Sequence, residues 1–247
     1  GGLTLSYRIK GFIFRNKLSI THNSANESPW GSFGTYAMMN PYSRIYNESG
    51  QLNRSYNYTA MSGVVDPQTN PIWNSMINTK EISRYTDITN NFYAEWAVNE
   101  SFKLTGRVGF SSILSSNDSF MPASHTSFVK YEGEDIYRKG YYMQGNGTTV
   151  NFSSDLGANY SLSLGKSVLF LNGQWNMATY SNDNSYVEAE GFPNDNMDHI
   201  IFATQYRKNG KPGGSESISR SLGGIVSANY AYDNRYLFDA NYRITGS

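Results

Sequence analysis

The three histidines are the first residues to test for chemistry, because imidazole is a common metal ligand and general base. His22, His125 and His199 lie far apart in the chain, and none has carboxylates nearby at the spacing of a ligand set. The chain contains no cysteine, so a thiolate site and a disulfide framework are both excluded. We therefore predict histidines in polar loops, with no metal and no cofactor.

Two further patterns resemble catalytic or binding motifs. Gly165, Lys166 and Ser167 match the end of a P-loop, but the glycine required five positions earlier is Tyr160, so we predict a hairpin turn there. The acidic residues form two loose groups without calcium-loop spacing, which predicts solvated loop faces. These groups are Glu132, Glu134 and Asp135, and Asp183, Asp195 and Asp198. The sequence indicates no catalytic residues and predicts that the chain is not an enzyme.

Aromatic residues in polar segments are the remaining candidates for ligand contact. Trp30, Tyr36, Tyr42 and Trp73 have rings that could stack on sugars, but packing of the loops against one another is the favoured explanation for most of them. The substrate-binding residues are therefore left unassigned.

Composition narrows the class of protein. The 247 residues include 20 Tyr, 13 Phe and 4 Trp, although only 38% of the chain is hydrophobic and the mean hydropathy is -0.54. Net charge is zero, and no run of like charge predicts nucleic-acid binding. No stretch is apolar enough for a membrane-spanning helix. Any crossing of a membrane would therefore use strands.

Apolar and polar residues alternate in four places, each interrupted by a short turn. This period predicts eight strands of about ten residues in four hairpins. The hairpins cover residues 3–21, 88–110, 150–177 and 218–245, with turns at Lys10–Gly11, Asn99–Ser101, Ser163–Ser167 and Asp233–Asn234. In the first hairpin, Asn16 is a polar exception on the apolar face.

Long polar segments connect the hairpins, at about 23–84, 112–146 and 180–216, and the third is predicted to hold a short helix near 194–203 capped by Asn194 or Asp195. Strict alternation of short and long connections is typical of an outer-membrane β-barrel. Aromatic residues gather beside the short turns, as in a membrane-interface girdle. They are Tyr7, Phe12, Trp96, Phe102, Tyr160, Tyr230, Tyr232 and Tyr236. A soluble β-sandwich is the competing fold.

Three segments resemble SusC/RagA family TonB-dependent transporters. The last turn and strand, 232–247, are similar to a Tyr-x-x-Lys/Arg-Tyr-Leu turn and a strand ending Arg-x-Asp-Gly-Ser, with Thr245 in place of the usual Asp. Residues 190–195, Glu-Gly-Phe-Pro-Asn-Asp, resemble a loop of that family. The third segment begins at Phe14, Arg15 and Asn16 and continues to Asn40, Pro41 and Tyr42.

The resemblance implies an all-β, antiparallel up-and-down meander, a partial segment of an outer-membrane β-barrel with long extracellular loops. Residues 1–247 would be part of a TonB-dependent receptor barrel domain, without its plug and the rest of its about 22 strands. The implied function is import of oligosaccharides or peptides. The implied partners are outer-membrane lipid, a SusD-like lipoprotein lid, TonB through the missing plug, and the glycan or peptide. The implied location is the outer membrane of a Gram-negative, Bacteroidetes-like cell.

Two other functions remain open from sequence. One is an outer-membrane barrel that does not use TonB, such as a porin or an adhesin. The other is a soluble carbohydrate-binding β-sandwich. The strand order separates the sandwich from the barrel, whereas an upstream plug domain and a neighbouring lid gene separate the importer from the porin.

Overall fold

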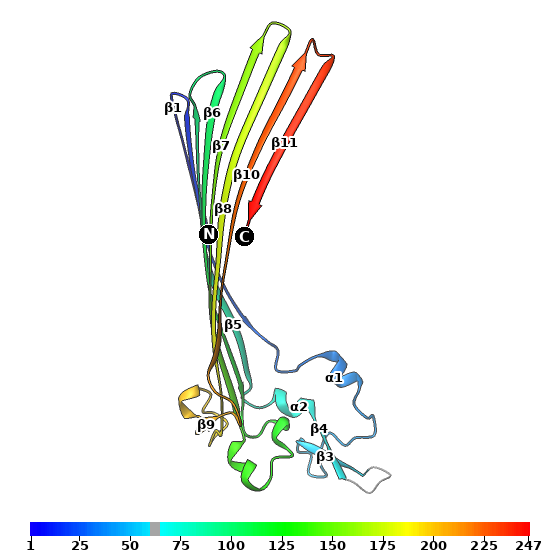
Figure 1. Cartoon of the computed structure of the whole chain (residues 1–247). Helices are drawn as coiled ribbons and strands as arrows, with labels where there is room; N and C mark the ends of the chain where they lie inside the picture. Colours follow the sequence, from blue (N-terminus) through cyan, green and yellow to red (C-terminus); the bar gives the residue numbers. More distant parts are fainter. Residues whose placement is uncertain (60–64) are drawn as a thin grey trace.

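Eight long strands follow one another in a single antiparallel sheet, in chain order (Figure 1). The computed structural model describes residues 1–59 and 65–247. The strands are β1 (Gly2–Ile9), β2 (Phe12–Asn26), β5 (Lys80–Ala97), β6 (Phe102–Met121), β7 (Tyr141–Leu164), β8 (Ser167–Glu190), β10 (Gly213–Tyr232) and β11 (Tyr236–Gly246). Within these residues β1 and β11 are edges that do not pair with each other. The predicted open meander is confirmed, and this order excludes a sandwich of two packed sheets.

Short turns close every hairpin at one end of the sheet, where they were predicted. The first turn has Lys10 at φ 37 and Gly11 at φ 83, the positive dihedrals that suit the twist of a two-residue hairpin. A Cβ on Gly11 would lie 2.9 Å from the Ala97 carbonyl oxygen. Glycine at this position is therefore required by both its φ and its close neighbour.

The six strands between β1 and β11 are longer than predicted. β7 and β8 each have 24 residues, and the long connections shrink to 27–79, 122–140 and 191–212. The prediction of about ten residues per strand was wrong because it used the alternation of apolar and polar residues as its signal. The outer part of β6, from Ser115 to Ser119, carries polar side chains in succession, yet its backbone continues to pair with β7.

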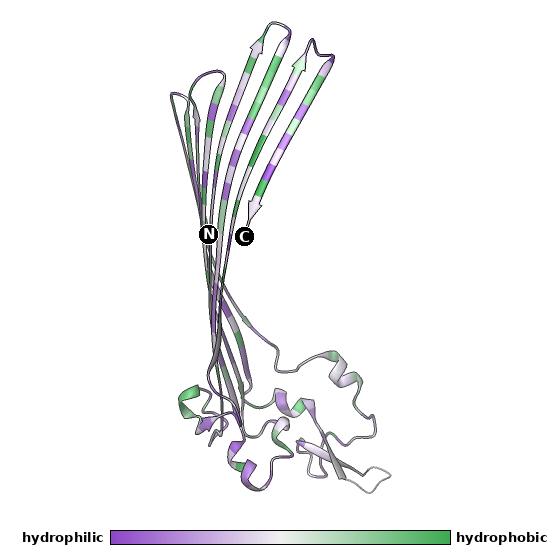
Figure 2. Ribbon diagram, viewed as in Figure 1, coloured by the Kyte–Doolittle hydropathy of each residue, from purple (hydrophilic) through white to green (hydrophobic). Residues whose placement is uncertain are grey.

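Cross-strand register gives the sheet one apolar and one polar face, since directly paired residues share a face. One register row contains Leu5, Asn16, Phe92, Val108, Ser154, Met177 and Leu222. The adjacent row contains Arg15, Tyr93, Arg107, Asp155, Asn176, Gly223 and Thr245. Figure 2 shows the resulting alternation of hydrophobic and hydrophilic residues along the strands nearest the turns.

The predicted girdle residues share the apolar face. Phe12 stacks on Trp96 with ring centroids 5.1 Å apart, and Phe14 lies 6.3 Å from Phe92. Asn16, the polar exception on this face, is compensated by Asn90. Each amide donates to the other, at 3.0 and 3.1 Å, so the oxygen and one N–H of each amide are paired within the sheet.

The buried core lies at the opposite end of the sheet, where the connections gather (Figure 1). Phe120, Tyr142 and Phe192 pack together there and are 1%, 1% and 4% exposed. The connections carry the short elements α1 (Phe33–Ala37), β3 (Ser55–Thr59), β4 (Val65–Thr69), α2 (Pro71–Ser75), η1 (Thr126–Phe128), η2 (Gly133–Arg138), η3 (Ile200–Phe202) and β9 (Gln205–Tyr206). None of the helices in the described residues is long and apolar enough to cross a membrane.

The helix predicted at 194–203 is a single 3-10 turn, η3, and its cap was predicted wrongly. His199 is the cap, and its Nδ1 accepts from the Ile201 amide at 3.3 Å. The side chain of Asn194 accepts from the nearby Asn196 amide, while the carboxylate of Asp195 accepts from Ser124 in another connection. Both predicted caps are therefore used elsewhere.

Candidate functional site

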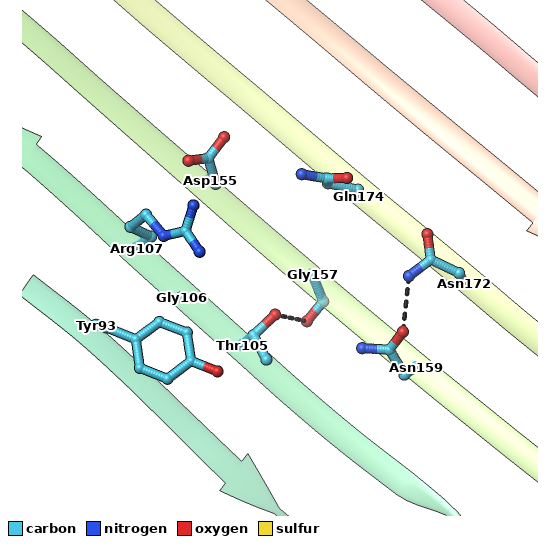
Figure 3. Close-up of a pocket in the computed structure, with 9 residues that line it drawn as sticks. All are labelled: Tyr93, Thr105, Gly106, Arg107, Asp155, Gly157, Asn159, Asn172 and Gln174. Atoms are coloured by element: carbon cyan, nitrogen blue, oxygen red, sulfur yellow. Dashed lines mark hydrogen bonds between the residues drawn. The ribbon is translucent and has the colours of Figure 1, made fainter. Parts of the chain in front are cut away.

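A hollow in the polar face of the sheet, near the middle strands, is the first candidate site (Figure 3). Its volume is about 170 Å³, which is room for several water molecules or one small polar group. Its lining residues come from four adjacent strands, β5 to β8. They are Tyr93, Thr105, Gly106, Arg107, Asp155, Gly157, Asn159, Asn172 and Gln174.

Gly157 leaves the floor of the hollow open. A Cβ at this position would lie 2.5 Å from the Thr105 Oγ1, the same hydroxyl that donates to the Gly157 carbonyl at 3.5 Å. Any side chain at Gly157 would therefore displace Thr105 and occupy part of the hollow. Glycine at position 157 therefore leaves space in the hollow and is not needed for a turn of the backbone.

The rim of the hollow offers both donors and acceptors. Asn172 donates to Asn159 at 2.7 Å, which fixes two amides on one side (Figure 3). On the other side the Arg107 guanidinium lies 5.9 Å from the centre of the Tyr93 ring, and Asp155 is its cross-strand partner. This mixture of groups suits reversible binding of polar solute groups through hydrogen bonds.

The three long connections form one unit, called here the loop platform, comprising 27–59, 65–79, 122–140 and 191–212. The first connection is bound to the second by side chains that reach backbone carbonyls. Arg54 Nη2 donates to the His125 carbonyl at 2.6 Å, and Trp73 Nε1 donates to the Ser124 carbonyl at 2.9 Å. Asn74 and Thr126 exchange two hydrogen bonds at 2.7 and 3.0 Å.

The third connection joins the same unit. The Asp195 carboxylate accepts from the Ser124 amide at 3.1 Å, and the backbone carbonyl of Asp195 accepts from the Asn78 side chain at 3.2 Å. Arg138 forms an ion pair with Glu190, whose side chain is 7% exposed. Because the links join all three connections, the platform is a fixed surface rather than three independent loops.

The three histidines are separate in the structure, each with a local role. His22 hydrogen-bonds to Thr86 at 3.0 Å, and His125 accepts from the Ser127 amide at 3.1 Å as the cap of η1. Burial, together with the nearby positive charge of Arg54, lowers the pKa of His125 to about 4. Among the described residues no cluster of three His, Cys, Asp or Glu could hold a metal ion.

Several predicted acids take part in the platform instead of facing only solvent. Asp135 lies 3.4 Å from Lys208 of the third connection, and Asp195 is bonded as described above. The P-loop-like triplet lies in the turn between β7 and β8, as predicted. There Lys166 is 3.1 Å from Asp233 of the next turn.

The four candidate aromatic residues have different environments. The indole of Trp73 is used to join two connections, and Tyr36 donates to the Trp30 carbonyl at 2.6 Å. Tyr42 is 92% exposed and lines a cavity of about 700 Å³ in the first connection. Met38, Arg44 and Tyr56 line the same cavity. Of the four, Tyr42 is thus the most exposed and the one that lines this cavity.

Sequence reasoning did not single out the residues of the hollow. No local pattern marks Arg107, Asp155 and Gln174 as a site, because their proximity depends on register between strands far apart in the chain. One local signal was available. Gly157 interrupts the polar face of a strand, where glycine often marks a close approach.

A single twisted sheet with an apolar face, a polar face and all long loops at one end defines the wall of a large β-barrel. Solved structures share this fold. The RagAB peptide transporter matches with a TM-score of 0.73 and 17% identity over 99% of this chain and 27% of that chain. The RagAB peptide importer matches in its closed-closed state (TM-score 0.72, 18% identity, 98% and 27% covered) and in its open-open state (0.72, 17%, 99% and 27%).

The predicted resemblance to SusC/RagA barrels is thereby confirmed in the fold. At this level of identity the likeness concerns the fold alone. The chain spans about a quarter, 27%, of the length of these solved chains. No family model and no curated protein matches the sequence.

Proposed function

We propose that the chain is a wall segment of a TonB-dependent importer in a bacterial outer membrane. Residues 1–247 would belong to its barrel domain, and the plug and the other strands would lie elsewhere in a longer protein. The carrying observation is the register, which keeps the two faces separate across all eight strands. Such a wall can face lipid on one side and a water-filled lumen on the other.

The platform and the hollow have separate tasks in this proposal. The platform lies at the outer end of the wall and would meet a SusD-like lipoprotein lid and the arriving solute. The hollow would contact that solute inside the lumen. The solute is an oligosaccharide or a peptide, and the likeness to peptide transporters supports the latter. The chain would transport without breaking bonds, since the hollow offers hydrogen-bonding groups without a nucleophile beside a base.

The orientation of β11 tests the proposal directly. Ala240 pairs with Ala228 on the apolar face, whereas Asn241 pairs with Ser227 on the polar face. In the full-length barrel, Ala240→Arg would place a charge in hydrocarbon and cost about 2–4 kcal/mol near the midplane. Asn241→Arg would face the lumen and cost much less. The measurement is the free energy of refolding of both variants into the same lipid.

The two substitutions are matched, because they introduce the same side chain at neighbouring positions of one strand. Equal losses for both variants would contradict a wall with one face in lipid. A larger loss for Asn241→Arg would mean that the faces are assigned the wrong way round.

A further inference from the structure

Basic side chains gather on one half of the polar face. Arg8 of β1, Arg15 and Lys17 of β2, and Arg107 of β6 all share this face by register. All four are exposed. We call this group the basic strip.

The basic strip is only partly neutralised by the acids beside it. None of its four members forms an ion pair within the described part of the chain. Two acids lie beside the strip. Asp155 is the cross-strand partner of Arg107, and Glu95 accepts from the Tyr93 hydroxyl at 2.6 Å and lies 3.3 Å from Lys103. Four basic residues therefore face two acids, one of which is shared with Lys103, and the strip keeps a net positive charge.

Tyr93 organises the centre of the strip. Arg15 and Arg107 flank its ring, at 6.0 and 5.9 Å from the ring centre. Arg15 is on β2 and Arg107 is on β6, and β5 lies between these two strands. The two strands are therefore roughly 10 Å apart in the direction of the hydrogen bonds. Two guanidinium groups fixed at this spacing on an aromatic ring repel each other, and a carboxylate placed between them would relieve that repulsion.

The opposite half of the polar face differs in chemistry. At the same depth β8 and β10 present Asn176, Ala178 and Ser221, and β11 adds the single basic residue Arg243. The hollow at Gly157 lies between the two halves, and Arg107 and Tyr93 line both it and the strip (Figure 3). The basic surface therefore ends in a concavity, where a group of the solute could enter, rather than in a flat face.

We propose that the basic strip binds carboxylates of the transported solute, so that the importer takes an acidic oligomer. This inference rests on the proposed function and adds a class of solute to it. The carboxylate would meet Arg15, Lys17 and Arg107, and the neighbouring part of the solute would occupy the hollow. The match is one of charge: a cationic strip beside amide groups selects anionic solutes with polar backbones.

The chain contains no cysteine, so single cysteines in its wall can report the local potential. Asn91 and Ser221 lie in one register row, through Gly109, Ser153 and Ala178, at the same depth on the polar face. Asn91 is the cross-strand partner of Lys17, whereas Ser221 is on the far half. The full-length importer, freed of other reactive cysteines, would carry Asn91→Cys or Ser221→Cys. Each variant is labelled with anionic ethylsulfonate and cationic trimethylammonium methanethiosulfonates.

For each position we compare the labelling rate of the anionic reagent with that of the cationic reagent. We expect this ratio of rates to be about tenfold higher at position 91 than at position 221. Arg15→Gln with Lys17→Gln should abolish most of that difference. A hexaglutamate peptide should slow labelling at position 91, and hexaglutamine should not. Equal reagent preference at both positions, or no protection by hexaglutamate, would overturn the proposal.

An experiment that contradicts solute binding by the basic strip can be distinguished from one that contradicts the proposed function. If position 221 is labelled while position 91 is unreactive to both reagents, another part of the protein covers the strip, and it is not a solute site. In that outcome the Ala240→Arg and Asn241→Arg comparison would still show whether the wall lies in lipid.

Discussion

The wall and the loop platform are stabilised in different ways. On the wall, large apolar side chains such as Leu222, Val226 and Phe238 remain 44%, 60% and 66% exposed. In the platform and the strand ends that join it, Phe120, Phe128 and Tyr142 are 1%, 5% and 1% exposed. The wall thus has no buried core of its own, whereas the platform end of the sheet has one.

This difference shows where each part obtains its stability. The platform buries apolar residues of its own and pairs most of its buried polar side chains internally, although Arg54 Nε and Ser124 Oγ are buried without a partner. The wall has continuous backbone pairing but must be covered on its apolar face by something outside the chain. In the proposed barrel that cover is lipid, so changes in the two regions should affect different measurements.

The largest expected effect is in the platform core. Phe120→Ala in the full-length barrel should destabilise the platform by about 3–5 kcal/mol, because it removes a fully buried ring. The loss should appear as faster hydrogen exchange or proteolysis of 122–140 and 191–212. Phe238→Ala, an exposed ring on the wall, is the control. Equal loss of platform protection in the control would mean that the two regions unfold together.

Next in size is the loss of a buried amide. Asn70 is 0% exposed, accepts from the Ile72 amide as the cap of α2, and donates to the Asn53 carbonyl at 2.7 Å. Asn70→Ala should therefore cost about 1–3 kcal/mol of platform stability. Exposed Asn23→Ala should cost almost nothing. Proteolysis of the first connection measures both, and an unchanged cleavage rate for Asn70→Ala would refute the role of this amide.

The wall offers a smaller effect of a different kind. Asn16→Leu would leave Asn90 without its partner on the apolar face and should cost about 1 kcal/mol in lipid. Replacing both residues with Leu should recover most of the loss, because no amide is then left unsatisfied. The measurement is a double-mutant cycle, in which the free energy of refolding into lipid is compared for the two single variants and the double variant. Additive losses would show that the two amides do not act as a pair.

The last expected effect differs in kind, because it is a pH dependence confined to the platform. His125 has its pKa lowered to about 4 by burial, with the charge of Arg54 adding to the shift. Between pH of about 6.5 and 4 the unfolded histidine binds a proton that the folded one does not. Platform stability should therefore fall as pH falls through this range, and it should be fully retained above it.

Hydrogen exchange of the platform against pH measures this effect. His125→Asn keeps a side chain that can cap η1 but removes the titration, so its protection should not change over the same range. A wild-type profile that is flat from pH 7 to 4 would contradict the assignment.

Much of the wall could be predicted from sequence, because alternation is a local signal. Residues such as Val226, Ala228 and Tyr230 reveal one face within a single strand, and short turns such as Lys10–Gly11 have strong conformational preferences. The order of the strands follows from those turns, since each joins neighbours. The outer halves of the strands were missed because polar side chains on both faces hide the period.

The candidate site was not predictable to the same extent. Arg107 and Asp155 are 48 positions apart by their numbers, and only register makes them partners. The links of the platform, such as Arg54 to His125, join side chains to backbone carbonyls and leave no pattern in the sequence. Long-range geometry of this kind requires the fold to be known first.

The length of the strands has a consequence for the height of the platform. In β7, residues 141–149 extend beyond the apolar alternation that starts at Val150. In the proposed barrel, at about 3.3 Å per residue and a tilt of about 40°, they would raise the platform roughly 20 Å above the hydrocarbon of the membrane. At that height the platform would stand among or beyond the lipid headgroups. A large extracellular protein could then contact Tyr42 and its neighbours without touching the membrane.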